Sequence, residues 1–413
     1  MQYIDMLRKQ PADKTALITE TETYTYGRLW QKAAAIRKNI ASDEAVHVIS
    51  SSPIADQLCR FLAYSGSTAV PVMATAAGAV QLPKSMNVPH TACMGVMTSG
   101  TTGPSKILWR DYASWADFFP VQNAVFGITN QTILFCQGSL AFTGNLNLYL
   151  GVLAAGGTII GADSFHPKTW LTLLESHQAN AVYLIPAKLQ LLPQTADHTY
   201  NKITHIISGS QALGRPQAQR LQQTFPQSEI ILYYGASELN YITYITDKNM
   251  TADTSCVGKP FPGVSLTIGK DEEILVTTPY HVLGITVPFS LHDRGRMDAA
   301  GNLYFLGRSG DRCNVNGRHV STYRIEQAIC THLPVREAAV FAVHGAYADC
   351  LMAVLGGAGH SIDRTKLWKG LRPYLQEYEI PKTCVVLDSL PKNESGKIDK
   401  QTLQRLFTQA ERV

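Results

Sequence analysis

The 413-residue sequence lacks the features that mark several common classes of protein. Its formal net charge is only +4 and 16% of its residues are charged, so nothing indicates nucleic acid as a partner. The longest apolar run, at residues 150–162, is interrupted by glycines and is too short to span a bilayer. No basic segment precedes an apolar core at the first residues, so we expect no signal peptide.

Paired cysteines are also missing. The eight cysteines are scattered along the chain and none forms a CxxC pair, which argues against both a metal cluster and a disulfide framework. Scattered, reduced thiols are typical of a cytoplasmic protein, and we predict that location. The length allows two or three domains, and a hydrophobic content of 45% is enough for a sizeable core.

The most informative stretch is Thr-Ser-Gly-Thr-Thr-Gly-Pro-Ser-Lys at residues 98–106, directly after the apolar run 94–97. Backbone N–H groups of glycine and threonine, several hydroxyls and the charge of Lys106 together predict a phosphate-binding loop. It is not a Walker A loop, because only two residues separate Gly100 from Gly103 and Lys106 does not follow directly. A plain Ser/Thr/Gly surface loop is the alternative for any single stretch of this kind.

The order TSGTTG-x-x-K resembles the phosphate loop of the AMP-forming adenylating enzymes, which include acyl- and aryl-CoA ligases and adenylation domains. Here Pro104 and Ser105 are transposed relative to the family pattern, and Ile107 replaces its glycine. Further motifs resemble the family's in the same order, at residues 206–211, 231–238 and 391–399. The resemblance therefore covers nearly the whole chain.

The resemblance implies a site for ATP. Tyr234 would stack on the adenine, Glu238 would hold Mg²⁺, and Asp293 would accept hydrogen bonds from the ribose hydroxyls. Asp293 stands where the family has Thr-Gly-Asp, but this Thr-Gly is absent, which leaves the local backbone geometry open. Arg308 would reach the ribose or a phosphate. The nucleotide-binding residues implied in this way are Thr98, Ser99, Gly100, Thr101, Thr102, Gly103, Gly209, Ser210, Gln211, Tyr234, Gly235, Ser237, Asp293 and Arg308.

The resemblance also implies a division of the chain and a mechanism. Residues 1–308 would form the AMP-binding domain, and residues 309–413 a mobile domain that swings about the hinge residue Gly310. Lys397, in the loop Pro-Lys-x-x-x-Gly-Lys-Ile-Asp, would bridge the substrate carboxylate and the α-phosphate, with Lys106 as the second catalytic lysine. Gly317 would line the path of the pantetheine thiol. The implied acceptor is CoA or the phosphopantetheinyl arm of a separate carrier protein.

Local patterns predict an α/β fold. Thr25 is placed to cap a helix that runs to Ile40, residues 46–49 read as a strand, and Pro53 opens a second helix. Leu367, Trp368, Leu371 and Leu375 predict one helix near the C-terminus. Combined with the resemblance, these patterns predict a large N-terminal domain of α/β sheets with a β-rich subdomain, followed by a small α+β C-terminal domain.

The substrate pocket is expected at Phe142 and Asn145. Relatives that activate amino acids place an Asp here to pair with the ammonium group; its absence argues against an α-amino acid. Asn145 has two interpretations of equal weight, a polar contact to an aryl acid and a simple helix cap.

A carboxylic acid is therefore the expected small-molecule substrate. A short region before the phosphate loop and the missing Asp favour a hydroxybenzoate loaded on a carrier protein in siderophore biosynthesis. A fatty or short-chain acyl-CoA ligase is the alternative, and a non-catalytic protein that binds nucleotide or acyl ligand is an alternative of another class.

Overall fold

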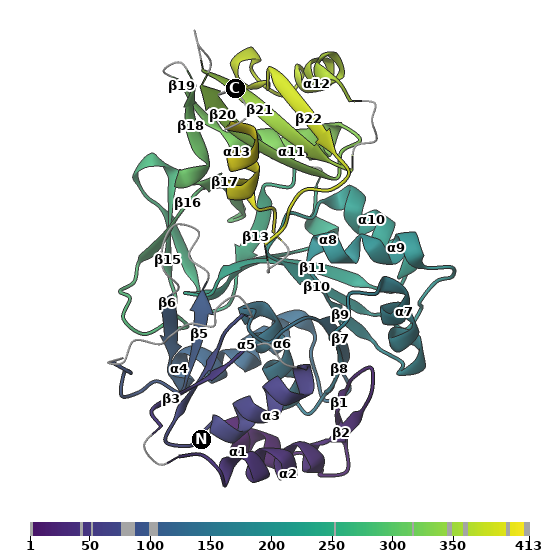
Figure 1. The fold of residues 1–413 in the computed structure, drawn as a ribbon, viewed down its shortest axis with the longest axis vertical. Coiled ribbons are helices and arrows are strands. Elements are labelled where there is room, and N and C mark those ends of the chain that lie inside the picture. Colours follow the sequence, from purple (N-terminus) through teal and green to yellow (C-terminus); the bar gives the residue numbers. More distant parts are fainter. Residues whose placement is uncertain are drawn as a thin grey trace. The chain divides into compact units, whose positions relative to one another are not determined.

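The computed structural model describes residues 3–41, 44–50, 53–75, 87–98, 106–251, 253–315, 318–344, 349–357, 362–393 and 397–408. Its contacts divide the chain into two compact units (Figure 1). Unit 1 comprises Met1–Leu266, Val276–Phe289 and Gly301–Leu303, and unit 2 comprises Thr267–Leu275, Ser290–Ala300 and Tyr304–Val413.

The larger sheet of unit 1 has the strand order β13-β12-β11-β10-β9-β7-β8-β1-β2. Its central strands are mutually parallel, and antiparallel pairs occur at both ends. The strands are β1 (Thr15–Ile18), β2 (Thr23–Thr25), β7 (Ile133–Gln137), β8 (Thr158–Ala162), β9 (Ala181–Tyr183), β10 (His205–Gly209), β11 (Glu229–Ala236), β12 (Asn240–Thr246) and β13 (Cys256–Pro260).

A second sheet of unit 1 has the order β3-β4-β5-β6. The first three strands are parallel, and β6 returns antiparallel to β5. Val72, Ala74 and Met97 are buried against it. Its strands are β3 (Val46–Ile49), β4 (Val70–Met73), β5 (Met94–Thr98) and β6 (Lys106–Arg110).

Two helices of unit 1, α2 and α3, begin where the sequence predicts. Thr25 caps α2 through a hydrogen bond from Arg28 N to its hydroxyl, and the apolar face of α3 is buried. The helices are α1 (Tyr3–Arg8), α2 (Tyr26–Arg37), α3 (Ile54–Tyr64), α4 (Tyr112–Trp115), α5 (Phe119–Phe126), α6 (Thr143–Ala154), α7 (Pro167–Ser176), α8 (Pro186–Leu189), α9 (Leu191–Thr195) and α10 (Arg215–Thr224).

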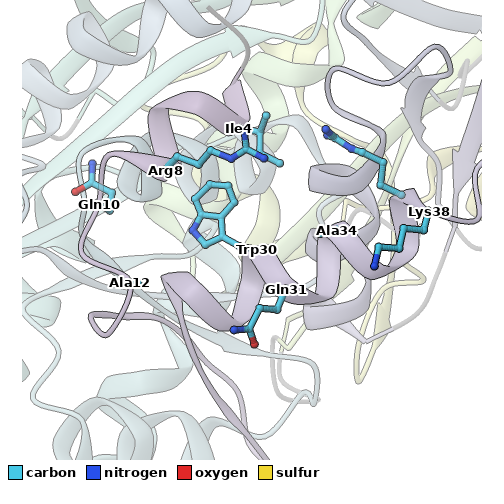
Figure 2. Close-up of a pocket in the computed structure, with 9 residues that line it drawn as sticks. Ile4, Arg8, Gln10, Ala12, Trp30, Gln31, Ala34 and Lys38 are labelled. Carbon is cyan, nitrogen blue, oxygen red and sulfur yellow. The ribbon is translucent and has the colours of Figure 1, made fainter.

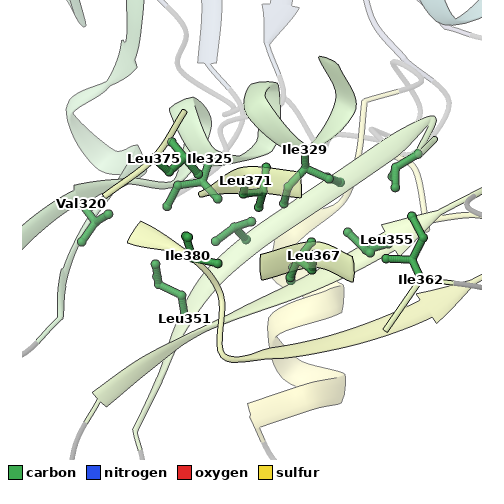
Figure 3. Close-up of a cluster of buried hydrophobic side chains, with 14 of the residues drawn as sticks. Val320, Ile325, Ile329, Leu351, Leu355, Ile362, Leu367, Leu371, Leu375 and Ile380 are labelled. Carbon is green, nitrogen blue, oxygen red and sulfur yellow. The ribbon is translucent and has the colours of Figure 1, made fainter. Parts of the chain in front are cut away.

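Unit 2 contains most residues of the four strands β14 to β17 and a small α+β part. The centre of the α+β part is the sheet β20-β21-β22, whose alternate residues belong to two apolar clusters, one on each face. Helices α11 and α12 pack on one face, where Val340 and Leu351 contribute to the larger cluster (Figure 3). Leu403 of α13 belongs to the cluster on the other face.

The strands of this part are β14 (Ser265–Ile268), β15 (Glu273–Thr277), β16 (Phe289–Met297), β17 (Leu303–Arg308), β18 (Arg312–Val315), β19 (Arg318–Ser321), β20 (Glu337–His344), β21 (Asp349–Gly356) and β22 (Thr383–Leu387). The helices are α11 (Thr322–His332), α12 (Arg364–Leu371) and α13 (Lys400–Thr408).

These layers confirm the predicted fold class, with two local errors. Helix α2 ends at Arg37, although the sequence predicts that it runs to Ile40. Helix α12 ends at Leu371, so Leu375 lies beyond it, although this leucine is buried in the same cluster. Trp368 lies in the helix as predicted and is 37% exposed, because the inward face of α12 is formed by Leu367 and Leu371.

A cavity of about 520 Å³ opens beside α1 and α2 (Figure 2). Its lining includes Trp30 and the cationic residues Arg8, Arg37 and Lys38, and none of the residues predicted to act on a substrate. No helix within the described ranges is both long and apolar enough to cross a membrane.

Candidate functional site

The predicted phosphate loop connects the antiparallel strands β5 and β6. Thr98 ends β5, Lys106 begins β6, and the two are paired across the hairpin. Lys106 is exposed. The other predicted loop residues, Ser99, Gly100, Thr101, Thr102 and Gly103, lie outside the described residues.

The second predicted element is the tight turn between β11 and β12, which carries Ser237 and Glu238. The register of the two strands shifts after Tyr234, at Gly235. A Cβ on Gly235 would stand only 2.5 Å from Asn240 O, so the turn can close only with glycine at this position. The sequence motif therefore reflects a steric requirement at Gly235.

A buried arginine stabilises this turn through hydrogen bonds. Arg110, the last residue of β6, is 1% exposed and donates to Ser237 O at 2.7 Å, Ser114 O at 2.9 Å and Tyr280 O at 3.0 Å. Burial lowers the pKa of Arg110 to about 10, and the nearby Glu238 opposes this shift. The side chain thus remains a cation at neutral pH and joins the β11–β12 turn, α4 and the segment at Tyr280. The sequence analysis assigned it no role.

Oxygen atoms gather at the outer side of the same turn. The hydroxyls of Ser237 and Thr143 share a hydrogen bond of 2.8 Å, and Glu238 is half-buried and forms no ion pair with a described residue. Carboxylate and hydroxyl oxygens are the ligands that Mg²⁺ prefers. No cluster of three acidic or metal-ligating side chains occurs in the described part of the chain. One carboxylate fits a Mg²⁺ ion whose remaining ligands are phosphate oxygens and water.

The end of β10 carries the residues that are predicted to lie along the adenine, Gly209, Ser210 and Gln211. A Cβ on Gly209 would lie 2.4 Å from the ring of Tyr233, so the backbone approaches this buried ring closely. Ser210 has a left-handed backbone conformation, with φ of 69°, and Gln211 accepts a hydrogen bond from Ala187 N. Tyr234, next to Tyr233, is half-buried on β11.

The two predicted pocket residues lie at the start of α6. Phe142 precedes the helix and is half-buried, whereas Asn145 is buried. The Asn145 amide donates to Ser139 O at 3.0 Å and more weakly to Gln137 O at 3.4 Å. Asn145 is the third residue of α6 and not its cap, and its amide stabilises the turn before the helix by donating to these two carbonyls.

Unit 2 contains the second group of predicted residues. Asp293 on β16 is 2% exposed, and its Oδ1 lies 3.4 Å from Nε of Arg308 on β17. Lys397 is close enough to feel both charges: desolvation lowers the pKa of Lys397, the Arg308 cation lowers it further, and Asp293 opposes them. The structure thus brings together three residues that are separated by up to about a quarter of the chain.

Local hydrogen bonds hold Lys397 in place. Lys397 N donates to Asn393 Oδ1 at 3.0 Å and Asn393 N donates to Lys397 O at 2.8 Å. Asp399 N donates to Pro391 O, and the Asp399 carboxylate caps α13 by accepting from Thr402 N at 3.0 Å. The lysine is therefore attached to an ordered turn end and to a helix N-terminus.

The backbone before Asp293 adopts a conformation that suits glycine. His292 has φ of 58°, and its N–H donates to the Ser290 hydroxyl at 2.9 Å. This is the position of the glycine in the family's Thr-Gly-Asp pattern, so the backbone keeps that geometry with a histidine in place. Although Thr-Gly is absent, Asp293 is buried and lies next to Arg308.

The predicted hinge residue lies in the short turn Ser309–Asp311. A Cβ on Gly310 would meet nothing within 4 Å, so space does not require a glycine here. Asp311 accepts from Arg308 N at 3.1 Å and lies 3.7 Å from the Lys400 ammonium. Gly317 lies outside the described residues.

A buried carboxylate anchors the far side of this turn. Glu326 accepts from Val340 N at 2.7 Å and pairs with Lys400 at 2.8 Å. Burial raises the pKa of Glu326 to about 7, and Lys400 limits the rise. Lys400 therefore links the hinge turn to a carboxylate that titrates near neutral pH.

Comparison with known proteins identifies the family. Residues 38–284 match the AMP-binding enzyme model, and residues 324–397 match the model of the AMP-binding enzyme C-terminal domain. The chain belongs to the AMP-binding enzyme family. This AMP-binding enzyme is an AMP-forming carboxylate–thiol ligase, an activity that replaces the non-catalytic alternative.

Relatives of this AMP-binding enzyme are named as CoA ligases. A putative long chain fatty acid-CoA ligase VraA from Staphylococcus haemolyticus is 30% identical over 325 residues, which cover 75% of this chain and 69% of the relative. The protein of the same name from Staphylococcus epidermidis is 24% identical and covers 100% of this chain and 99% of the relative. The uncharacterized acyl-CoA ligase YhfT from Bacillus subtilis is 27% identical, covering 76% of this chain and 68% of the relative.

Solved structures share the fold. ATP-bound MatB from Rhodopseudomonas palustris has a TM-score of 0.83 at 21% identity, covering 99% of this chain and 100% of its own. The o-succinylbenzoate CoA synthetase MenE from Bacillus subtilis, in complex with an acyl-adenylate, has a TM-score of 0.83 at 17% identity, with 98% of each chain covered. The TM-scores show that the AMP-binding enzyme shares this architecture. At such low identities, the roles of single residues remain predictions.

Proposed function

We propose that this AMP-binding enzyme activates an acyl or aryl carboxylate with MgATP, releases pyrophosphate, and transfers the acyl group from the adenylate to the thiol of CoA. The names of the relatives favour CoA as the acceptor. The proposal that a hydroxybenzoate is loaded on a carrier protein has no comparable support, and fatty acids are the first alternative to test.

The charged group of Asp293, Arg308 and Lys397 carries this proposal. A buried carboxylate beside a cation is expensive to desolvate, and it is suited to accept hydrogen bonds from two adjacent ribose hydroxyls. The Lys397 ammonium, held by its turn, would neutralise charge that develops between the substrate carboxylate and the α-phosphate. Such preorganised charge lowers the barrier without a protein nucleophile.

In unit 1, the residues at the β11–β12 turn would have separate roles. Glu238 would bind Mg²⁺, which would neutralise phosphate charge, and Ser237 and Thr143 would offer hydroxyl donors beside it. Tyr234 would stack on the adenine. Arg110 touches no substrate in this scheme and acts by holding Ser237 and its turn.

The test is ATP–pyrophosphate exchange with hydroxybenzoates, cinnamates, and short and long fatty acids, followed by thioester formation with CoA. Lys397→Ala should lower exchange at least about 100-fold, the scale expected for losing one preorganised charge in the transition state. Lys369→Ala, which removes an exposed lysine of α12, is the matched control and should leave exchange unchanged. Exchange by Lys397→Ala at the level of the control would reject the assignment.

A further inference from the structure

Lys188 occupies the edge of the sheet where ligands bind in this type of fold. It lies in α8, the single turn that directly follows β9. Strands β9 and β7 are parallel neighbours, so α8 and Gln137, the last residue of β7, lie at the same carboxyl edge. In open α/β sheets, ligands bind outside the carboxyl ends of the strands.

Two nitrogen donors converge at this edge. Lys188 Nζ donates to Gln137 Oε1 at 2.5 Å. A Cβ built on the neighbouring Gly138 would lie 3.7 Å from Lys188 Nζ and 3.4 Å from Asn145 Nδ2. Both nitrogen atoms therefore lie beside Gly138, which has no side chain to cover them. An oxygen atom of a ligand that approaches beside this glycine would accept from the ammonium and replace the weak, 3.4 Å hydrogen bond of Asn145 to Gln137 O.

The charge of Lys188 is not balanced at this edge. Among the residues that the structure describes, it forms no ion pair, and its neighbour Cys136 is a neutral thiol because burial raises the pKa of Cys136 to about 12. Lys188 is half-buried, and desolvation lowers its pKa. A half-buried cation whose partner is a neutral amide favours an additional, anionic partner.

We propose that Lys188 and Asn145 bind a second acidic group on the substrate, so that the acid activated by this enzyme is a dicarboxylic acid. The inference rests on the proposed function and specifies its substrate class. The second carboxylate pairs with the Lys188 ammonium over Gly138, while the other carboxylate reacts with ATP. A monocarboxylic acid of the same length leaves Lys188 without an anion and is a poorer substrate.

The experiment compares pyrophosphate exchange with α,ω-dicarboxylic acids from succinate to suberate and with the monocarboxylic acids of equal chain length. The wild-type enzyme should prefer at least one dicarboxylic acid in kcat/KM. Lys188→Met should reduce that preference by about 10- to 100-fold, the scale of one hydrogen bond to a charged group. Lys188→Arg should retain much of it. Lys168→Met, an exposed lysine of α7, is the matched control and should change nothing.

The outcomes separate this inference from the function on which it rests. Exchange with monocarboxylic acids alone, or a preference that survives Lys188→Met, overturns the dicarboxylic acid and leaves the ligase assignment intact. No exchange with any acid, while ATP still binds, rejects both. Lys188→Gln, which keeps a polar group at this position, provides the same comparison if Lys188→Met does not fold.

Discussion

Replacing Arg110 with methionine tests whether the buried arginine organises the site of this enzyme. The guanidinium donates to three carbonyls, of which Ser114 O and Tyr280 O also accept from Asn240 Nδ2, at 3.0 and 3.2 Å. Only Ser237 O would lose a donor that no other described side chain replaces. At about 1 kcal/mol for each of the three lost bonds, and about 1 kcal/mol more for an unsatisfied buried carbonyl, we expect the free energy of unfolding to fall by about 4 kcal/mol.

Urea unfolding of unit 1, followed by tryptophan fluorescence, measures the stability change. Trp115 lies close in sequence to Ser114 and is fully buried, which makes it a suitable reporter. We also expect the variant to bind Mg²⁺ more weakly, because the turn that carries Glu238 is released. Pyrophosphate exchange should then require a higher Mg²⁺ concentration. Arg60→Met, which removes an exposed ion pair on α3, is the matched control and should cost less than about 1 kcal/mol. Equal stability of the Arg110 and Arg60 variants would refute the reasoning.

Three further predictions concern unit 2. Gly310→Pro should spare pyrophosphate exchange and block thioester formation, whereas Gly310→Ala should be silent, because nothing lies within 4 Å of a Cβ there; equal loss of both half-reactions in the proline variant contradicts the hinge. The pKa of Glu326 is raised to about 7, above its ordinary value, so its contribution to stability is present at low pH and is lost as the pH rises through about 7. The free energy of unfolding should fall by about 2 kcal/mol between about pH 5 and pH 8, and Glu326→Gln should remove this decline; a decline that persists in the variant refutes the role of this carboxylate. His292→Gly should raise the stability by about 1 kcal/mol, because φ of 58° is strained for histidine, and an unchanged urea midpoint would show that its contacts offset the strain.

Linear motifs predicted the residues that we assign to the nucleotide, since their spacing is dictated by the turns that carry them. The tight approach of Gly235 to Asn240 explains why such a motif is readable in sequence. Arg110 was missed because two of its three partners are distant in sequence, with Tyr280 170 positions away, and because an arginine at a strand end is usually a surface charge. Lys188 was missed for the same reason: its partner Gln137 lies on another strand, 51 residues away.

The elements were predicted best where the apolar pattern and the cap agree. Thr25 and the buried face of α3 are examples, because burial and local hydrogen bonds favour the same helix. The pattern misled at the end of α12, where Leu375 is buried but lies outside the helix. Burial alone does not distinguish a helical residue from one in the turn that follows.

The division of the chain has a consequence for motion. The chain passes between unit 1 and unit 2 five times, the last time after Leu303, and a body joined by five connections cannot rotate about one bond. If Gly310 is the hinge, the rotation therefore takes place inside unit 2. Asp293 and Arg308 precede Gly310, whereas Lys397 follows it, so the three charges form one group in only one position of the hinge. The protonation of Lys397 would then report, at each step of the enzyme's cycle, whether the lysine has left its partners.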